Sequence, residues 1–199
     1  MKLIGITMRA DSPSDYDEIR DGLDQQWLTF LHSCGLTPIL MPNNPSLIKT
    51  YLEQFVFSGI LLTGGNSPLQ FGGNSPARDE VDAYLIDWAI QNNKPLIGVC
   101  RGMQSIQLAY QQSLVPVSGH VKKQQVININ GQQTSVNSYH TLGAKSCELP
   151  LEPWAMSDDG VIKAVKHINK HIYGLMWHPE RNQPFQQRDI DFFIQVFNL

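Results

Sequence analysis

The sequence predicts an α/β fold, in which a mostly parallel central sheet is covered by helices on both faces. In the first half of the chain, short apolar runs alternate regularly with segments of helical periodicity, as right-handed βαβ crossovers require. In the second half, polar and apolar residues alternate around turn sequences, which predicts a small antiparallel addition toward the C-terminus. At 199 residues, we expect a single domain spanning residues 1–199.

Each element of the first half follows from its own pattern. The expected strands are apolar runs that end near glycine, proline or asparagine, at residues 2–7, 37–43, 58–65 and 95–99. The first expected helix carries Ile19, Leu23 and Trp27 at helical spacing, and Ser46 is the expected cap of the second. The expected helices cover residues 16–35, 45–55, 78–93 and 101–113, and a closing helix covers 186–199.

The second half contains two hairpin signals. Asn130-Gly131 lies within an alternating segment and predicts a type I′ turn between two antiparallel strands. Residues 162–175 give two further strands around a turn at Asn169-Lys170. We see no internal repeat or low-complexity segment.

Composition excludes several classes of function. The net charge is −3 and charged residues make up 17% of the chain, which gives no reason to expect nucleic acid or an anionic membrane as partner. No apolar run approaches the roughly 20 residues of a membrane span. Cys34, Cys100 and Cys147 are an odd set without framework spacing, which indicates a reduced, cytoplasmic protein. The histidines form no metal-ligand pattern, and we expect no metal or other cofactor.

The stretch around Cys100 has the sequence Gly98-Val99-Cys100-Arg101-Gly102 and joins an apolar strand to a helix. This is the sulfur counterpart of the G-x-S-x-G nucleophile elbow, where residues two positions from the strained tip must be small. Cys100 would then lie at the carboxyl end of a parallel strand and at a helix N-terminus, which favours a thiolate. The Arg101 N–H could donate to an oxyanion. A lone G-x-C-x-G is equally compatible with a buried packing cysteine, so the choice depends on a base elsewhere.

A base and its partner occur together at His178-Pro179-Glu180. In an extended chain, residues two apart point to the same side, and a residue before proline is held extended, so Glu180 could orient the His178 imidazole. An imidazole held by a carboxylate and aimed at a thiol is the arrangement of cysteine acyl transfer. Gly64-Gly65, at the end of the third strand, could offer a second oxyanion N–H.

Gly64-Gly65, the segment GVCRGMQ (98–104) and the segment WHPE (177–180), in this order, resemble the class I glutamine amidotransferase fold, which is flavodoxin-like. Within it the chain is similar to the stand-alone γ-glutamyl hydrolases of the peptidase C26 and γ-glutamyl-γ-aminobutyrate hydrolase type, including the segment VNSYH (136–140). Residues 15–31 further resemble a sub-branch associated with surface-polysaccharide gene clusters, some of whose members hydrolyse γ-glutamyl-CDP-amidate in capsule phosphoramidate synthesis.

The resemblance implies a role for each matching residue. Cys100 would be the nucleophile, His178 the general base and acid, and Glu180 its orienting partner. Gly65 and Arg101 would supply oxyanion N–H groups. The glutamyl portion would be held by Gln104, Ser138 and Tyr139. The implied reaction is attack on a γ-glutamyl amide, release of an amine, and hydrolysis of the glutamyl thioester.

Two positions depart from the family pattern. Asp82 stands where the relatives usually have the glutamate of R-D-x-x-E, and it could alter a salt bridge or a substrate contact. Gln111-Gln112 replaces a glycine pair, which we expect to change only packing near the end of a helix.

Several polar residues remain without an assigned role. His120 and His140 are either pocket-lining or ordinary loop histidines, and Lys122-Lys123 is either a phosphate contact or a solvated face. The cluster around Arg20 and Asp24 is by default an exposed helix face, with a substrate or dimer surface as the alternative; its members are Tyr16, Glu18, Arg20, Asp21 and Asp24.

The expected partner is a small γ-glutamyl substrate, and a homodimer is left open. A glutaminase subunit that delivers ammonia to a separate synthetase is the first alternative function. A non-catalytic regulatory module is the second. The loops expected to set specificity are 8–20, 66–79 and 115–125.

Overall fold

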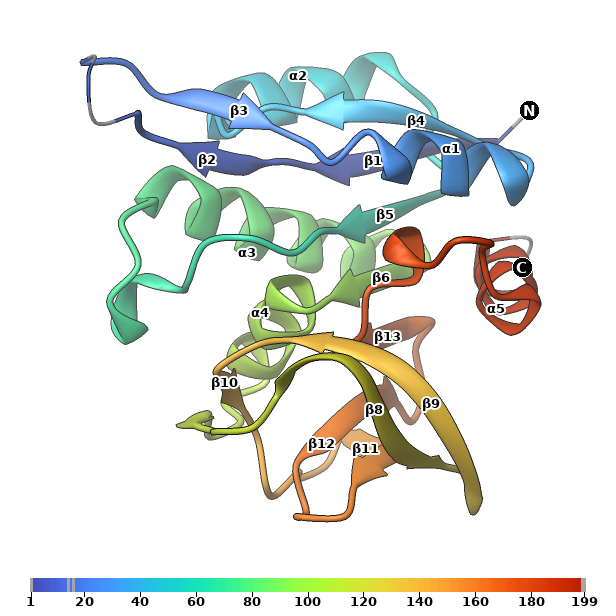
Figure 1. Ribbon diagram of the computed structural model, residues 1–199. Coiled ribbons are helices and arrows are strands. Elements are labelled where there is room, and N and C mark those ends of the chain that lie inside the picture. The colour runs from blue at the N-terminus through green and yellow to red at the C-terminus, as the bar shows by residue number, and fades with distance from the viewer. Residues whose placement is uncertain (1, 14, 16, 198–199) are drawn as a thin grey trace.

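The computed structural model describes residues 2–13, 15 and 17–197 of the chain. Within these residues, nine strands form one sheet in the order β4-β1-β5-β6-β13-β12-β11-β8-β9 (Figure 1). The first five are parallel: β4 (Leu36–Met41), β1 (Lys2–Thr7), β5 (Gly59–Leu62), β6 (Leu96–Val99) and β13 (Ile172–Leu175). The other four are antiparallel: β12 (Ile162–His167), β11 (Leu151–Ser157), β8 (Val121–Ile129) and β9 (Gln132–Tyr139).

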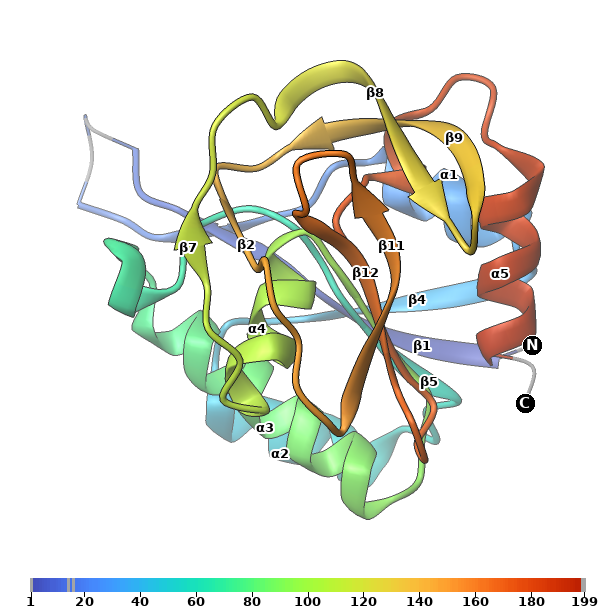
Figure 2. The ribbon, with the colours of Figure 1, turned by 90° about the horizontal axis from the view of Figure 1, so that it is seen from below.

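Helices cover both faces of the parallel half, which confirms the predicted fold class (Figures 1 and 2). One face is packed by α1 (Gln26–Ser33) and α5 (Gln187–Phe197), which place Phe30 and Phe193 against Leu61 of β5. The opposite face is packed by α2 (Pro45–Gln54), α3 (Pro76–Gln91) and α4 (Arg101–Ala109), which meet Ile60 and Leu62. Successive residues of a buried strand point to opposite faces, so one short apolar run supplies both cores.

The antiparallel addition is larger than the small one expected, because it comprises four strands that continue the same sheet. The chain then returns to the parallel half through β13, which lies beside β6. The type I′ turn is confirmed, since Asn130 and Gly131 both have positive φ, 49° and 89°. The predicted turn at Asn169-Lys170 also joins two antiparallel strands, β12 and β13.

The helix predicted over 16–35 is wrong in its first part. In place of a helix, β2 (Arg9–Asp11) pairs antiparallel with β3 (Arg20–Gly22), and the helix begins at Gln26. The Asp24 carboxylate accepts a hydrogen bond from the Gln26 N–H at 3.0 Å, and an aspartate used in this way starts a helix rather than continuing one. Ile19, expected on the apolar stripe, is 77% exposed. Tyr16 lies outside the described residues.

Smaller differences concern helix ends. The cap of α2 is Asn44, not Ser46: the Asn44 side chain accepts hydrogen bonds from the N–H groups of Ser46 and Leu47, with Pro45 in the first helical position. Residues 198–199 of the predicted closing helix lie outside the described residues. In the part of the chain that the structure describes, no helix combines the length and hydropathy needed to cross a membrane.

Candidate active site

Cys100 lies at a sharp turn between β6 and α4. Its backbone has φ 53° and ψ −105°, a left-handed conformation that side-chain-bearing residues adopt only under constraint. The Cys100 N–H donates to the Leu175 carbonyl of the neighbouring strand at 2.7 Å. A Cβ atom on Gly98 would lie 2.5 Å from the backbone carbonyl of Gly102, and one on Gly102 would lie 2.2 Å from the Leu62 carbonyl oxygen. The close approach of strand and helix therefore requires glycine at both positions.

His178 follows β13, the strand next to β6, and therefore reaches the same edge of the sheet as Cys100. Its Nδ1 atom lies 2.7 Å from Oε1 of Glu180, and both side chains are buried. The expected contact is present, and His178 has the extended backbone expected before proline, with φ −109° and ψ 94°, but the chain does not stay extended through Glu180. Glu180 lies in the 3₁₀ turn η2 (Pro179–Arg181), so the turn rather than an extended chain brings the carboxylate back to the imidazole.

Asn137 holds the backbone of His178, a role that the sequence did not predict. Its side-chain amide donates to the His178 carbonyl at 2.7 Å and accepts from the His178 N–H at 2.8 Å. The only signal in the sequence was its place in the segment VNSYH. The contact spans 41 residues along the chain.

The charges of the thiol and the imidazole stabilise one another. Burial opposes a thiolate at Cys100, but the His178 imidazole, its hydrogen bond to the sulfur and the Arg101 N–H outweigh burial and lower the pKa of Cys100. Burial likewise opposes the imidazolium, but the Cys100 sulfur and Glu180 raise the pKa of His178 to about 9. The two groups together favour a thiolate–imidazolium pair near neutral pH.

The glycine pair after β5 packs directly on these two residues. A Cβ atom on Gly64 would lie 2.7 Å from Cε1 of His178 and 3.5 Å from Cβ of Cys100. The next residue, Gly65, has φ 89°. The buried Arg78 guanidinium supports this loop, donating to the Thr63 carbonyl at 2.7 Å. The loop thus presents its backbone beside the sulfur, as an oxyanion site requires.

The Arg101 side chain points away from the sulfur, although its N–H faces it. Its buried guanidinium forms ion pairs with Asp82 and with Asp79 on α3. The open question about Asp82 is thereby answered within this structure: the residue forms a salt bridge. The ion pair fixes the start of α4 against α3.

Two hollows meet at Cys100 and His178. The first, about 290 Å³, is lined by Cys100 and is called here the cysteine pocket. It is also lined by Gln104, Tyr139 and His140, of which the first two are among the residues predicted to hold the glutamyl group. The Gln104 amide donates to the Leu142 carbonyl at 2.9 Å. Ser138 is absent from its lining, because the Ser138 hydroxyl is buried and donates to the His120 carbonyl at 2.7 Å.

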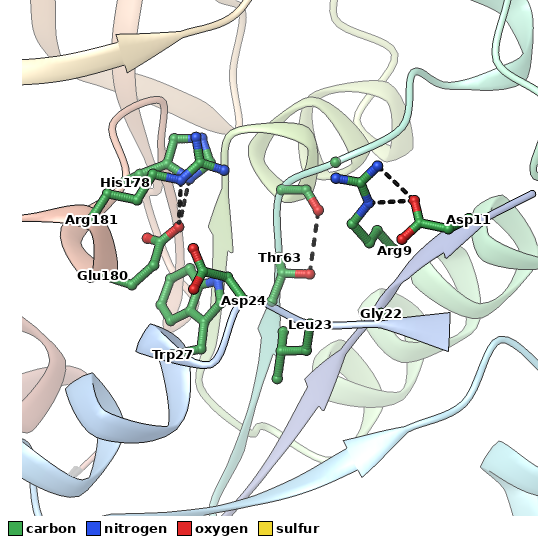
Figure 3. Close-up of a pocket in the computed structure, with 12 residues that line it drawn as sticks. Arg9, Asp11, Gly22, Leu23, Asp24, Trp27, Thr63, His178, Glu180 and Arg181 are labelled. Carbon is green, nitrogen blue, oxygen red and sulfur yellow. Dashed lines mark hydrogen bonds and ion pairs between the residues drawn. The ribbon is translucent and has the colours of Figure 1, made fainter. Parts of the chain in front are cut away.

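The second hollow, about 330 Å³, lies on the His178 side (Figure 3). We call it the arm pocket, after the β2–β3 pair that forms part of its wall. Its walls are β2, β3, the start of α1, the glycine loop and η2. Asp24 lines it, whereas Arg20 is not among the lining residues. Lys122 lines a separate surface hollow with Asp158 and Asp159. The charged residues of the arm pocket are Arg9, Asp11, Asp24, His178, Glu180 and Arg181.

A buried lysine behind the cysteine pocket was also missed. The Lys163 ammonium, 1% exposed, has three acceptors: Nδ1 of His120 at 2.8 Å, Nε2 of His140 at 2.7 Å and Oγ of Ser138 at 3.1 Å. Burial lowers the pKa of Lys163 to about 8 and that of His140 to about 3. His120 and His140 are therefore structural partners of this lysine, and only His140 also lines the cysteine pocket. The signal available was a lysine in the buried strand pattern of residues 162–165.

A cysteine on a sharp strand–helix turn at the carboxyl edge of such a sheet, with an imidazole and a carboxylate delivered after the last parallel strand, is typical of the cysteine-dependent amidohydrolases of the class I glutamine amidotransferase fold. The chain belongs to one family within that class, peptidase C26, whose model matches residues 2–125 and 111–180.

Individual relatives agree with this assignment. The chain is 28% identical over 183 residues to the γ-glutamyl-CDP-amidate hydrolase of Campylobacter jejuni, covering 89% of this chain and 90% of the relative. It is 29% identical over 202 residues to a γ-glutamyl-γ-aminobutyrate hydrolase of Escherichia coli, covering 80% and 79%. Its fold is similar to that of a glutamine amidotransferase from Thermotoga maritima, with a TM-score of 0.70, 13% identity, and coverage of 99% and 84%.

Proposed function

We propose that this amidohydrolase cleaves the γ-glutamyl amide bond of a small γ-glutamyl conjugate and releases glutamate through a thioester on Cys100. The observation that carries the proposal is the buried contact of 2.7 Å between His178 and Glu180 beside a cysteine of lowered pKa. The cysteine pocket next to the sulfur has polar groups from Gln104 and Tyr139 that suit a glutamyl group.

The proposed reaction has two halves. The Cys100 thiolate attacks the γ-carbonyl carbon, and the developing oxyanion accepts hydrogen bonds from the N–H groups of Gly65 and Arg101. The tetrahedral intermediate collapses as His178 transfers its proton to the leaving nitrogen, which breaks the C–N bond and leaves a glutamyl thioester. Water then loses a proton to His178 and attacks the thioester carbonyl. The second tetrahedral intermediate collapses with cleavage of the C–S bond, which releases glutamate and restores the thiolate–imidazolium pair. Glu180 orients the imidazole throughout.

Within this class we favour γ-glutamyl-CDP-amidate, in capsule or surface-polysaccharide synthesis. The support is the name of the Campylobacter jejuni relative, at 28% identity across most of both chains, and the likeness of residues 15–31 to its sub-branch. The three free cysteines suit a reduced compartment, and we place the protein in the cytoplasm.

A glutaminase subunit that supplies ammonia to a separate synthetase is the second candidate, favoured by the likeness to the Thermotoga maritima glutamine amidotransferase. The two proposals differ in what the isolated chain does. A hydrolase releases glutamate from its conjugate unaided, whereas a glutaminase subunit stays nearly idle on glutamine until its partner is added.

The test is glutamate release by the purified protein from γ-glutamyl-CDP-amidate, γ-glutamyl-γ-aminobutyrate and glutamine. We expect release from a conjugate without a partner, and its loss in Cys100→Ser but not in the matched control Cys147→Ser. The hydrolase proposal would be refuted if glutamine were the only one of these compounds to be turned over, and only after a synthetase had been added. An unchanged rate in Cys100→Ser would refute the nucleophile assignment.

A further inference from the structure

We propose that the arm pocket binds the leaving group of the substrate, and that Arg9 and Arg181 select leaving groups carrying a phosphoryl group. The inference rests on the proposed function and deepens it, because the cysteine pocket would contact only the glutamyl end of the substrate and so could not distinguish leaving groups. It assigns two specificity-determining residues, Arg9 on β2 and Arg181, which follows Glu180 in η2.

The positions of the two pockets relative to the reacting groups identify the leaving-group side. Cys100 lines the cysteine pocket, His178 lines the arm pocket, and Gly65 lines both. The acyl carbon must lie against the sulfur, and the leaving nitrogen must lie within hydrogen-bond reach of the imidazole that protonates it. A substrate whose carbonyl oxygen faces the glycine loop therefore extends its glutamyl end into the cysteine pocket and its leaving group into the arm pocket.

The β2–β3 wall of the arm pocket is anchored to the glycine loop, which contains Gly64 and Gly65. The Asn66 side chain, one residue after Gly65, accepts from the Ala10 N–H at 2.9 Å and donates to the Ala10 carbonyl at 2.8 Å. At the other strand, the Asp21 carboxylate accepts from the backbone and side chain of Asn43 at 2.9 and 2.7 Å. The pair β2–β3 is thus held at both edges, and a residue on it keeps a defined position relative to the scissile bond.

Arg9 and Arg181 lie on opposite sides of this pocket (Figure 3). Arg9 is oriented by Asp11, whose Oδ1 atom accepts from Nε at 2.7 Å and lies 2.6 Å from Nη2. The Arg181 guanidinium lies 5.0 Å from the centre of the Tyr139 ring, and its Nε is 3.4 Å from Glu180. The two side chains are 53% and 40% exposed, so each guanidinium is positioned by the protein while part of it faces solvent.

The carboxylates of the pocket are engaged with the protein. Asp11 is paired with Arg9, Glu180 with His178, and one oxygen of Asp24 accepts from the Gln26 N–H at 3.0 Å. Among the described residues, these contacts use Nε and Nη2 of Arg9 and Nε of Arg181. Nη1 of Arg9 and the two Nη groups of Arg181 are therefore left to meet a charged ligand, and charge-assisted hydrogen bonds from them suit the oxygens of a phosphoryl group. The second Asp24 oxygen suits a hydroxyl or amino donor next to that phosphoryl group.

Three synthetic substrates of equal length separate the charge classes: N-γ-glutamyl-2-aminoethyl phosphate, N-γ-glutamyl-2-aminoethanol and N-γ-glutamyl-1,2-diaminoethane. We expect kcat/KM, measured by glutamate release, to be highest for the phosphate. Arg9→Gln and Arg181→Gln should each lower kcat/KM for the phosphate by a factor about tenfold larger than the factor by which they lower it for the alcohol, since each removes a charge-assisted hydrogen bond. Arg188→Gln, at a half-buried arginine on α5 that lines neither pocket, is the matched control and should not change the ratio.

Equal kcat/KM for the three substrates, a preference for the diamine, or equal losses on phosphate and alcohol in both variants would overturn the inference while leaving the hydrolase intact. If no substrate releases glutamate, the proposed function fails instead. In that case calorimetric titration of the protein with 2-aminoethyl phosphate and with ethanolamine decides the inference. The inference is supported if 2-aminoethyl phosphate binds, ethanolamine does not, and Arg181→Gln weakens the binding. It is refuted if the two compounds bind equally or if neither binds.

Discussion

Replacing Gly64 with alanine tests whether the glycine loop and His178 form one catalytic unit. The added Cβ would lie 2.7 Å from Cε1 and 3.6 Å from Nε2 of His178. Ordinary carbon–carbon contacts begin near roughly 3.5 Å, so the ring or the loop must move by about 1 Å. The ring has little freedom, because Nδ1 is held by Glu180 at 2.7 Å and the backbone by Asn137. The displacement is therefore expected to open the contact between imidazole and sulfur.

A shift of about 1 Å in a catalytic group costs on the order of a hundredfold in rate, and overpacking costs about 1–3 kcal/mol of unfolding free energy. We expect Gly64→Ala to lower kcat for glutamate release by that factor while the protein stays folded. Gly160→Ala is the control: φ is 80° there and nothing lies within 4 Å of the added Cβ, so stability should fall without any change in kcat. A kcat within twofold of wild type in Gly64→Ala would refute the reasoning.

Three further outcomes follow from the charges of the site. Iodoacetamide at pH 7 should alkylate Cys100, whose pKa is lowered, and spare Cys147, whose pKa burial raises to about 11; mass spectrometry of the peptides checks this. Asp82→Ala removes one of the two carboxylates that pair with the buried Arg101 and should lower the free energy of denaturant unfolding by less than the about 3–5 kcal/mol of an uncompensated buried charge, because Asp79 still pairs with Arg101. Cys100 and then Glu180 raise the pKa of His178 to about 9 against the effect of burial, so Glu180→Gln should move the alkaline limb of the pH–rate profile to lower pH and reduce kcat about 10³-fold or more.

The parallel half of the fold was predictable because its signals are local. A strand such as β5 is recognised from its own apolar run, and Gly98 and Gly102 predict the sharp turn at Cys100 without reference to any other segment. The prediction failed where a local pattern competed with tertiary contacts. Residues 16–25 have helical spacing, but Asp24 starts the helix late and Asp21 binds Asn43, which draws the preceding chain into β3.

The polar contacts that hold the site were beyond reach for a different reason. Asn137 meets His178 across 41 residues and Lys163 meets His120 across 43, and such pairs depend on strand order and register rather than on any local pattern. The roles of His120 and His140 could not be decided before Lys163 was seen between them. The lowered pKa of His140 follows from its burial and from the Lys163 ammonium beside it, which are properties of the assembled sheet.

The late start of α1 has a consequence for specificity. Had the helix begun near residue 16, as its spacing suggests, Arg9 would have no β3 to pair with and the arm pocket would lose a wall. The proposed catalytic groups come from the ends of the parallel strands and need no such wall, since β6 and β13 already place Cys100 beside His178. A chain can therefore vary the β2–β3 pair and the leaving group it accepts without disturbing the thiolate. Exchanging residues 9–22 for those of a relative with another substrate should accordingly transfer leaving-group preference while Cys100 alkylation at pH 7 stays unchanged.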